Sequence, residues 1–190
     1  MRRAPVLFSL FLSFSLPGAC SFAPSAPEAR PVPILREGEL LPYPDRAGFL
    51  ECVPFARAVS GIDIRGNAWT WWDQADGLYW RGSVPRVGAV LTFKRDKSLR
   101  MGHVAVVVQV SNPREILVSH ANWGSDGDTR GVVHERQPVM DVSPANDWTQ
   151  VRLMNTKGSF GRVYPAHGFI YQPGTATRSV AGFDTGSAGR

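Results

Sequence analysis

MGHVAVVVQV, residues 101–110, decides the fold class, because its pattern predicts a β-strand. Side chains alternate between the two faces of a strand, so one face consists of four valines, Val104, Val106, Val108 and Val110. His103 lies on the other face with the small Ala105 and with Val107. We therefore expect room for a second element, such as a helix, to pack over the imidazole.

Further strands and two short helices are predicted around this segment. The strands are VGAVLTFKR (87–95), EILVSHANW (115–123), GVVHERQPV (131–139), TQVRLMN (149–155) and RVYPAHGFIYQ (162–172). Before them, residues 50–59 have helical apolar spacing that stops at Gly61, and NAWTWWDQA opens with Asn67, a good N-cap. Helices followed by strands predict an α+β fold, with short N-terminal helices packed on an antiparallel sheet of about five to six strands.

The first 20 residues, MRRAPVLFSLFLSFSLPGAC, have the pattern of a secretory signal peptide. Two arginines precede an apolar run that is too short to span a bilayer, and small residues follow it. LPGAC resembles the lipobox of bacterial lipoproteins, which would make Cys20 a lipidation site. Simple cleavage, with its best site ending at Ala23, is the alternative. Both predict export to the periplasm or cell envelope, and the first adds attachment to a membrane.

The chain of 190 residues allows one domain with tails. Residues 21–47 contain six prolines and almost no apolar periodicity, which predicts a Pro-rich tether. Residues 174–190 are rich in Gly, Ser and Thr and are predicted to be a disordered tail. The folded domain is therefore expected between them, at 48–173.

Charge and histidine spacing exclude some partners. The formal net charge of +5 favours anionic surfaces such as a cell wall or lipid headgroups. No cluster of basic residues is interleaved with aromatic ones, so nucleic acid is not expected as a partner. The four histidines lack the paired spacing of a zinc site. We predict no metal and no cofactor.

Cys52, in FLECVPFARAVSG (49–61), is left unpaired once Cys20 is lipidated or removed. A lone cysteine in an exported protein indicates either a reactive thiol or a small buried apolar side chain. If the helix that carries Cys52 packs over the face of His103, thiol and imidazole meet. Histidine can then take the thiol proton, and the thiolate can attack a carbonyl carbon.

A third polar residue is predicted on the next strand. His120 and Asn122 are two positions apart, so they share one strand face. Either side chain could hydrogen-bond the far nitrogen of His103, which would fix its tautomer and support the imidazolium. These residues alone leave the choice open.

Taken together, ECVPFAR, GNAWTWW, PRVGAVLTF, GHVAVV and HANW resemble the CHAP family. That family comprises cysteine- and histidine-dependent amidohydrolases and peptidases, related in fold to papain and to the NlpC/P60 enzymes. The resemblance extends from about Leu50 to Tyr171. It implies a papain-like CHAP fold and a hydrolase that cleaves amide bonds of peptidoglycan through a thioester.

The resemblance also assigns roles. It implies that Cys52 is the nucleophile, His103 the base and Asn122 the orienting residue, with His120 as the possible alternative third residue. The helix start beside Cys52 predicts a lowered thiol pKa, and the Cys52 N–H is expected to donate to the oxyanion. Three tryptophans are candidates for a substrate groove: Trp69, Trp71 and Trp72.

The predicted function is that of an exported cysteine amidase or endopeptidase acting on peptidoglycan. One alternative is a catalytically silent module that binds the cell wall with the same fold. Another is a cysteine amidase that acts on a different peptide-like substrate.

Overall fold

The computed structural model describes Pro42, residues 49–124 and residues 129–172. Three predicted segments lie outside the described residues and stay predictions: the signal peptide (1–20) with Cys20, the tether (21–47, apart from Pro42) and the tail (174–190). Among the described residues, no helix is long and apolar enough to cross a membrane.

Both predicted helices are present, and both are short. Helix α1 spans Cys52–Ser60. It ends where the sequence predicts, because Gly61 adopts the left-handed conformation (φ 72°) and donates its N–H to the Arg57 carbonyl. The second predicted helix is divided into a 3₁₀ turn, η1 (Ala68–Thr70), and one α-helical turn, α2 (Trp71–Gln74).

The remaining regular secondary structure of the described chain is β-strand. The strands are β1 (Arg81–Gly82), β2 (Val90–Phe93), β3 (His103–Asn112), β4 (Glu115–Ala121), β5 (Val133–Asp141), β6 (Gln150–Leu153) and β7 (Tyr164–Ile170). Strands β2 to β7 confirm the six predicted strands. The two-residue β1, which pairs with β7, was not predicted.

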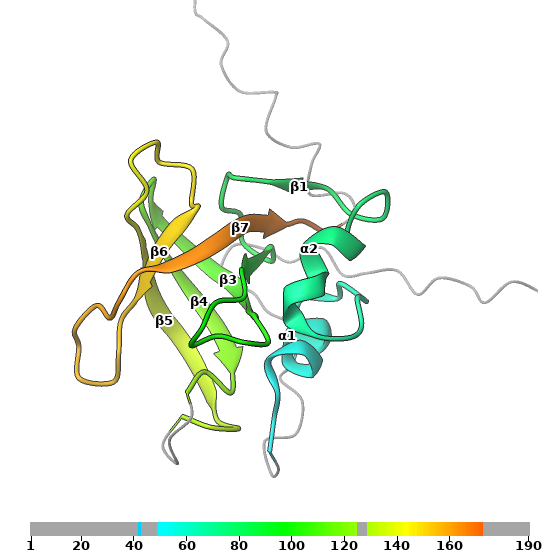
Figure 1. The fold of residues 1–190 in the computed structure, drawn as a ribbon, viewed down its shortest axis with the longest axis horizontal. Helices are drawn as coiled ribbons and strands as arrows, with labels where there is room; N and C mark the ends of the chain where they lie inside the picture. The colour runs from blue at the N-terminus through cyan, green and yellow to red at the C-terminus, as the bar shows by residue number, and fades with distance from the viewer. Residues whose placement is uncertain (1–41, 43–48, 125–128, 173–190) are drawn as a thin grey trace, which may run out of the picture. The chain divides into compact units, whose positions relative to one another are not determined.

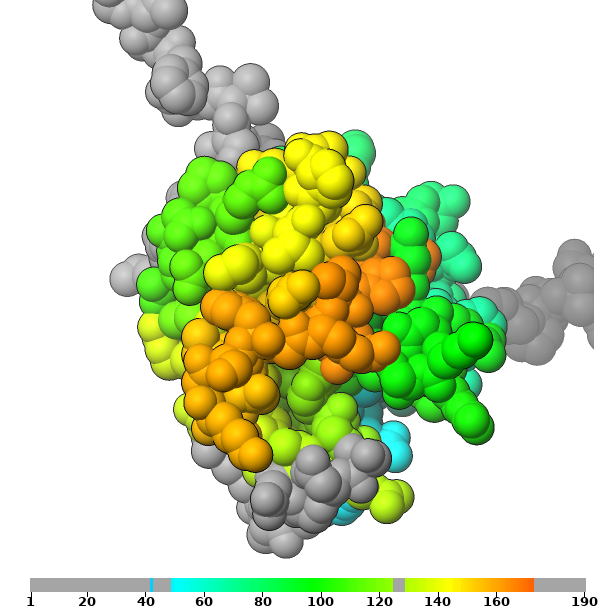
Figure 2. All heavy atoms as spheres, turned by 60° about the vertical axis from the view of Figure 1, so that its left-hand side comes forward, coloured from blue at the N-terminus to red at the C-terminus, as the bar shows by residue number. Residues whose placement is uncertain are grey.

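The sheet closes on itself, and this overturns the predicted fold class. The strand order is β1-β7-β2-β3-β4-β5-β6, and β6 also pairs with β7, through Gln150 opposite Pro165 and Val151 opposite Tyr164. Strands β2 to β7 therefore form a closed, six-stranded antiparallel barrel, with the helices on one side of it (Figure 1). Figure 2 shows the segments around β6 and β7, yellow to orange, side by side on the surface. The expected α+β fold, with short helices packed on a sheet, is wrong: the domain is mostly β.

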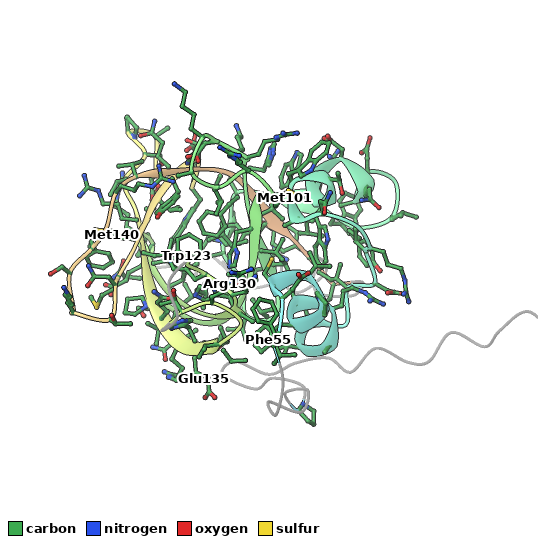
Figure 3. The ribbon with its side chains drawn as sticks, turned by 60° about the horizontal axis from the view of Figure 1, so that its bottom comes forward. Phe55, Met101, Trp123, Arg130, Glu135 and Met140 are labelled. Carbon is green, nitrogen blue, oxygen red and sulfur yellow. The ribbon has the colours of Figure 1, made fainter. Side chains whose placement is uncertain are left out.

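Two apolar clusters follow from the alternation of side chains on the strands. The first fills the barrel and includes Leu91, Phe93, Ala105, Val107 and Val118. The second lies between the helices and the outer face of the strands, where Phe55 and Val59 of α1 pack with valines of β2 and β3. Phe55 is fully buried and lies between α1 and the strands (Figure 3). Burial of such a side chain contributes about 2–3 kcal/mol to folding.

The sequence predicted that a helix packs on the strand face that carries His103. Helix α1 instead packs on the opposite face of β3. Its apolar residues contact Val104 and Val106, whereas His103 lies on the face that looks into the barrel. The two functional candidates are nevertheless close, because Cys52 is the first residue of α1 and His103 the first of β3. They meet at the ends of their elements rather than across a packed face.

Candidate active site

The first turn of α1 and the start of β3 open onto one cleft of about 670 Å³. Cys52 and His103 both line it, together with Asn122. The remaining wall comes from the segment before η1 and from the loop between β2 and β3, residues 97–102. The structure thus brings all three residues of the predicted catalytic set to the same cavity.

The Cys52 thiol is partly buried against the start of β3. Its sulfur accepts a hydrogen bond from the backbone N–H of Val104, the residue next to His103. Burial raises the pKa of the thiol to about 11, and the Glu51 carboxylate adds to this, although the Val104 amide opposes it. The expectation that the helix start lowers the thiol pKa is therefore wrong. Desolvation outweighs the dipole, and the sulfur carries its proton at neutral pH.

His103 is held in place by the residue before it. Gly102 has φ 66°, a conformation that side chains disfavour, and a Cβ there would lie 2.7 Å from the backbone nitrogen of Trp69. The Trp69 N–H in turn donates to the Met101 carbonyl, at 3.0 Å. The glycine therefore allows η1 to approach β3 closely, which sets where the histidine begins the strand.

The imidazole of His103 is 2% exposed and is surrounded by rings. Phe93 and Trp123 pack against it with ring centroids 5.8 and 4.7 Å away. Burial holds the pKa of His103 well below its usual range, and the neighbouring His120 and His134 lower it further. The residue is therefore neutral and able to accept a proton.

His120 occupies the third position. Its Nδ1 lies 2.8 Å from Nε2 of His103, and its own Nε2 hydrogen-bonds the side-chain oxygen of Gln137. Burial lowers the pKa of His120 to about 4, although the bond to Gln137 opposes this shift. The geometry thus favours His120, the alternative in the sequence analysis, as the residue that orients His103.

Asn122, to which the family resemblance assigns that role, makes a different contact. Its side-chain oxygen accepts the N–H of Gly131 at 2.9 Å, and the Gly131 carbonyl accepts the N–H of Leu50 at 3.1 Å. Leu50 lies two residues before Cys52. Asn122 therefore braces the segment that enters α1, on the nucleophile's side of the cleft.

The three tryptophans do not line the described cleft. Trp71 is fully buried in the cluster beneath the helices. Trp69 packs under the guanidinium of Arg95, and Trp72 stacks on His167 with centroids 5.4 Å apart. A tryptophan-lined groove is thus not supported. Helical spacing alone did not show which of the adjacent rings faces the barrel.

Two residues contact His120 in ways that the sequence did not predict. His134 carried no sequence signal beyond being one of four histidines without zinc-site spacing, and its ring centroid lies 5.6 Å from that of His120. Gln137 lies in no motif that would single it out, and its contact depends on the register of two strands. Among the described residues, no group of three or more metal-ligating side chains could hold a metal ion.

The cleft carries more positive than negative side chains. Four basic residues line it, namely Arg57, Arg65, Lys97 and Arg100, against one acidic residue, Glu51. Asp63 pairs with both Arg57 and Arg65. The cleft therefore suits a substrate that carries carboxylates.

A thiol and a neutral, oriented histidine in one cleft can carry out nucleophilic attack on a carbonyl group. The CHAP domain model matches residues 42–122, a region that contains Cys52, His103 and His120. This match confirms the resemblance to the CHAP family that the sequence motifs indicated. This domain points to a hydrolase of the amidase or peptidase class. No curated protein matches the chain.

Proposed function

We propose that this protein is an exported cysteine amidase or endopeptidase that cleaves amide bonds of peptidoglycan. The observation that carries the proposal is the shared cleft, where the sulfur of Cys52 contacts the amide next to His103 and His120 lies behind that imidazole. Cys52 is the nucleophile, His103 the base and His120 the residue that orients it.

In the first step, the neutral thiol and the neutral imidazole act together. Because the thiol pKa is raised to about 11, the sulfur attacks as His103 removes its proton, rather than as a preformed thiolate. The carbonyl oxygen becomes an oxyanion. The Cys52 N–H, in the first turn of α1, is the proposed donor to that oxyanion.

The second half of the reaction returns the proton. His103, now protonated, gives its proton to the departing amine, and the C–N bond breaks to leave a thioester on Cys52. Water then attacks the thioester while His103 acts as base again. The acid is released, and the thiol recovers its proton.

Two observations support peptidoglycan as the substrate. The signal-peptide pattern at residues 1–20 predicts a location where cell wall is present. The basic side chains of the cleft suit the carboxylates of peptide stems. Attachment to a membrane through Cys20 is part of the same proposal, because it would keep the enzyme close to the wall.

Digestion of purified sacculi tests the function. Fragments identified by mass spectrometry should appear with the wild-type protein and be absent with Cys52→Ala. Ala58→Ser serves as the control, because Ala58 is exposed on the same helix and does not line the cleft. The masses also show whether the bond cut joins sugar to peptide or lies within the stem.

Each other outcome contradicts part of the proposal. Fragments that persist with Cys52→Ala would exclude the thiol mechanism. Binding to sacculi without any new fragment would favour a silent wall-binding module. Cleavage of other peptide amides, with sacculi left intact, would keep the chemistry and exclude the wall substrate.

A further inference from the structure

We propose that Gln137 is a positioning residue that sets the tautomers of His120 and His103, and so makes Nδ1 of His103 the basic nitrogen. This inference rests on the proposed function for its role in catalysis. The hydrogen-bond arrangement itself can be tested without any substrate.

The orientation of the Gln137 amide is the starting point. Its NH₂ group donates to the backbone carbonyl of Met154, a group that can only accept. The amide oxygen therefore faces the other way, toward Nε2 of His120. Because that oxygen can only accept, Nε2 of His120 must carry a hydrogen.

The hydrogen on His120 determines the hydrogen on His103. His120 is neutral, since burial lowers its pKa to about 4, so its Nδ1 has a free lone pair. That lone pair faces Nε2 of His103 at 2.8 Å, and a hydrogen bond requires His103 to be the donor. The remaining nitrogen of neutral His103, Nδ1, is then the one without a hydrogen. It is the nitrogen able to receive the Cys52 proton.

A β-bulge brings Gln137 to His120. Val118 of β4 pairs with Gln137 of β5, whereas His120, two residues later, pairs with His134, three residues earlier. The extra residue on β5 lies where Arg136 adopts φ 52°. In regular pairing His134 and Gln137 would point to opposite faces. The bulge places both on the face of His120.

The hydrogen bonds from His103 through His120 to Gln137 also stabilise the imidazolium that His103 becomes during the reaction. When the S–H bond of Cys52 breaks, the proton forms an N–H bond at Nδ1 of His103, and the imidazolium keeps its hydrogen on Nε2. That hydrogen still points at the lone pair of His120, whose own hydrogen points at the Gln137 oxygen. The three groups are thus aligned to stabilise positive charge on His103.

In the described part of the chain, two histidines pack against His120. His103 approaches from β3 and His134 from β5, and Trp123 covers the ring from the loop after β4 with centroids 5.5 Å apart. Arg136 of β5 is engaged by the Gln109 side chain. A charge introduced at position 137 would therefore act on His120 first.

Nitrogen NMR of the full wild-type protein near neutral pH tests the arrangement directly, because the ¹⁵N shifts of neutral imidazole distinguish the two tautomers. We expect His103 and His120 both to carry their hydrogen on Nε2. His103 with its hydrogen on Nδ1 would overturn the proposal, whatever the outcome of the sacculus digest.

Gln137→Met removes the acceptor while nearly keeping the side-chain volume. We expect His120 to lose its single tautomer in the NMR spectrum and kcat to fall by at least about 10-fold, with KM nearly unchanged. Gln109→Met is the matched control, since Gln109 is a strand glutamine that contacts Arg136 rather than a histidine. Unchanged tautomers and kcat in Gln137→Met would contradict the proposal.

Gln137→Glu keeps the shape and tests the same arrangement if the methionine variant does not fold. A carboxylate beside His120 would favour its protonated form. Protonated His120 presents a hydrogen to Nε2 of His103, which moves the His103 hydrogen to Nδ1 and blocks the base. The acidic limb of the kcat profile should therefore move to higher pH, with activity retained above it. An unmoved limb would contradict the inference.

Discussion

The two sides of the cleft are constructed in different ways. Cys52 lies at the start of a nine-residue helix outside the barrel, and its sulfur accepts a hydrogen bond from the backbone of β3. His103 lies at the mouth of the barrel, inside a network of rings and side-chain hydrogen bonds that reaches Gln137. The nucleophile is therefore placed by helix packing, whereas the base is placed by a polar network.

Burial nevertheless has the same consequence on both sides. It raises the pKa of an acid such as Cys52 and lowers the pKa of a base such as His103, so both residues are neutral at neutral pH. Before the reaction, Cys52 is therefore a thiol rather than a thiolate, and His103 is a neutral imidazole rather than an imidazolium. Charge forms only as the proton moves, and the histidine side carries the groups that stabilise it.

The largest effect expected from this comparison is the loss of the base. His103→Ala should lower activity by roughly 10³-fold or more, about as severely as Cys52→Ala, because the two act as one unit. The double variant should be no worse than either single one. Sacculus digestion rates measure this, and additive losses would show that the two sides act independently.

Acid should lower the stability of the fold through His120, whereas Cys52, with its raised pKa, stays neutral in acid. His120 has a folded pKa of about 4 and an ordinary unfolded pKa near 6.5, so stability is fully present above pH 6.5 and falls as pH drops toward 4. The shift corresponds to about 3 kcal/mol in the free energy of unfolding. Urea unfolding between these pH values measures it.

The control for that prediction is His120→Phe, in which this part of the pH dependence should disappear. Because His103 also has a lowered pKa, some acid dependence should remain in the variant. An identical slope in wild type and variant would contradict the assignment of a neutral, buried His120.

The smallest effect is expected at Asn122. Asn122→Ala removes the acceptor of the Gly131 N–H and loosens the segment before α1, which should cost about 1–2 kcal/mol of stability. Activity should fall less than in His120→Ala, and the tautomers of both histidines should stay as in wild type. If His103 changes its tautomer in Asn122→Ala, then Asn122, and not His120, orients His103.

Local features of the fold were predictable from sequence, but closure of the barrel was not. The valine alternation of residues 104–110 and the glycine at 61 determine a strand and a helix end by short-range physics. Alternation is the same in an open sheet and in a barrel. Closure depends on β6 meeting β7, a pairing that no residue pattern in either strand specifies.

Prediction from sequence was limited in the same way for the site. Cys52 and His103 could be selected because the sequence predicts that Cys52 is left unpaired and that His103 begins a strand. His120 and Asn122 could not be separated, since both share the strand and the face. Gln137 could not be found at all, because a bulge determines which way it points.

The pH dependence of iodoacetamide alkylation at Cys52 tests the neutral pair most directly, since the thiolate is the reactive form. We predict a rate that keeps rising toward pH 11 and that changes little in His103→Ala, with the unfolded chain as reference. A rate that is already maximal below pH 8 and that falls in His103→Ala would reveal a thiolate–imidazolium pair and contradict the account.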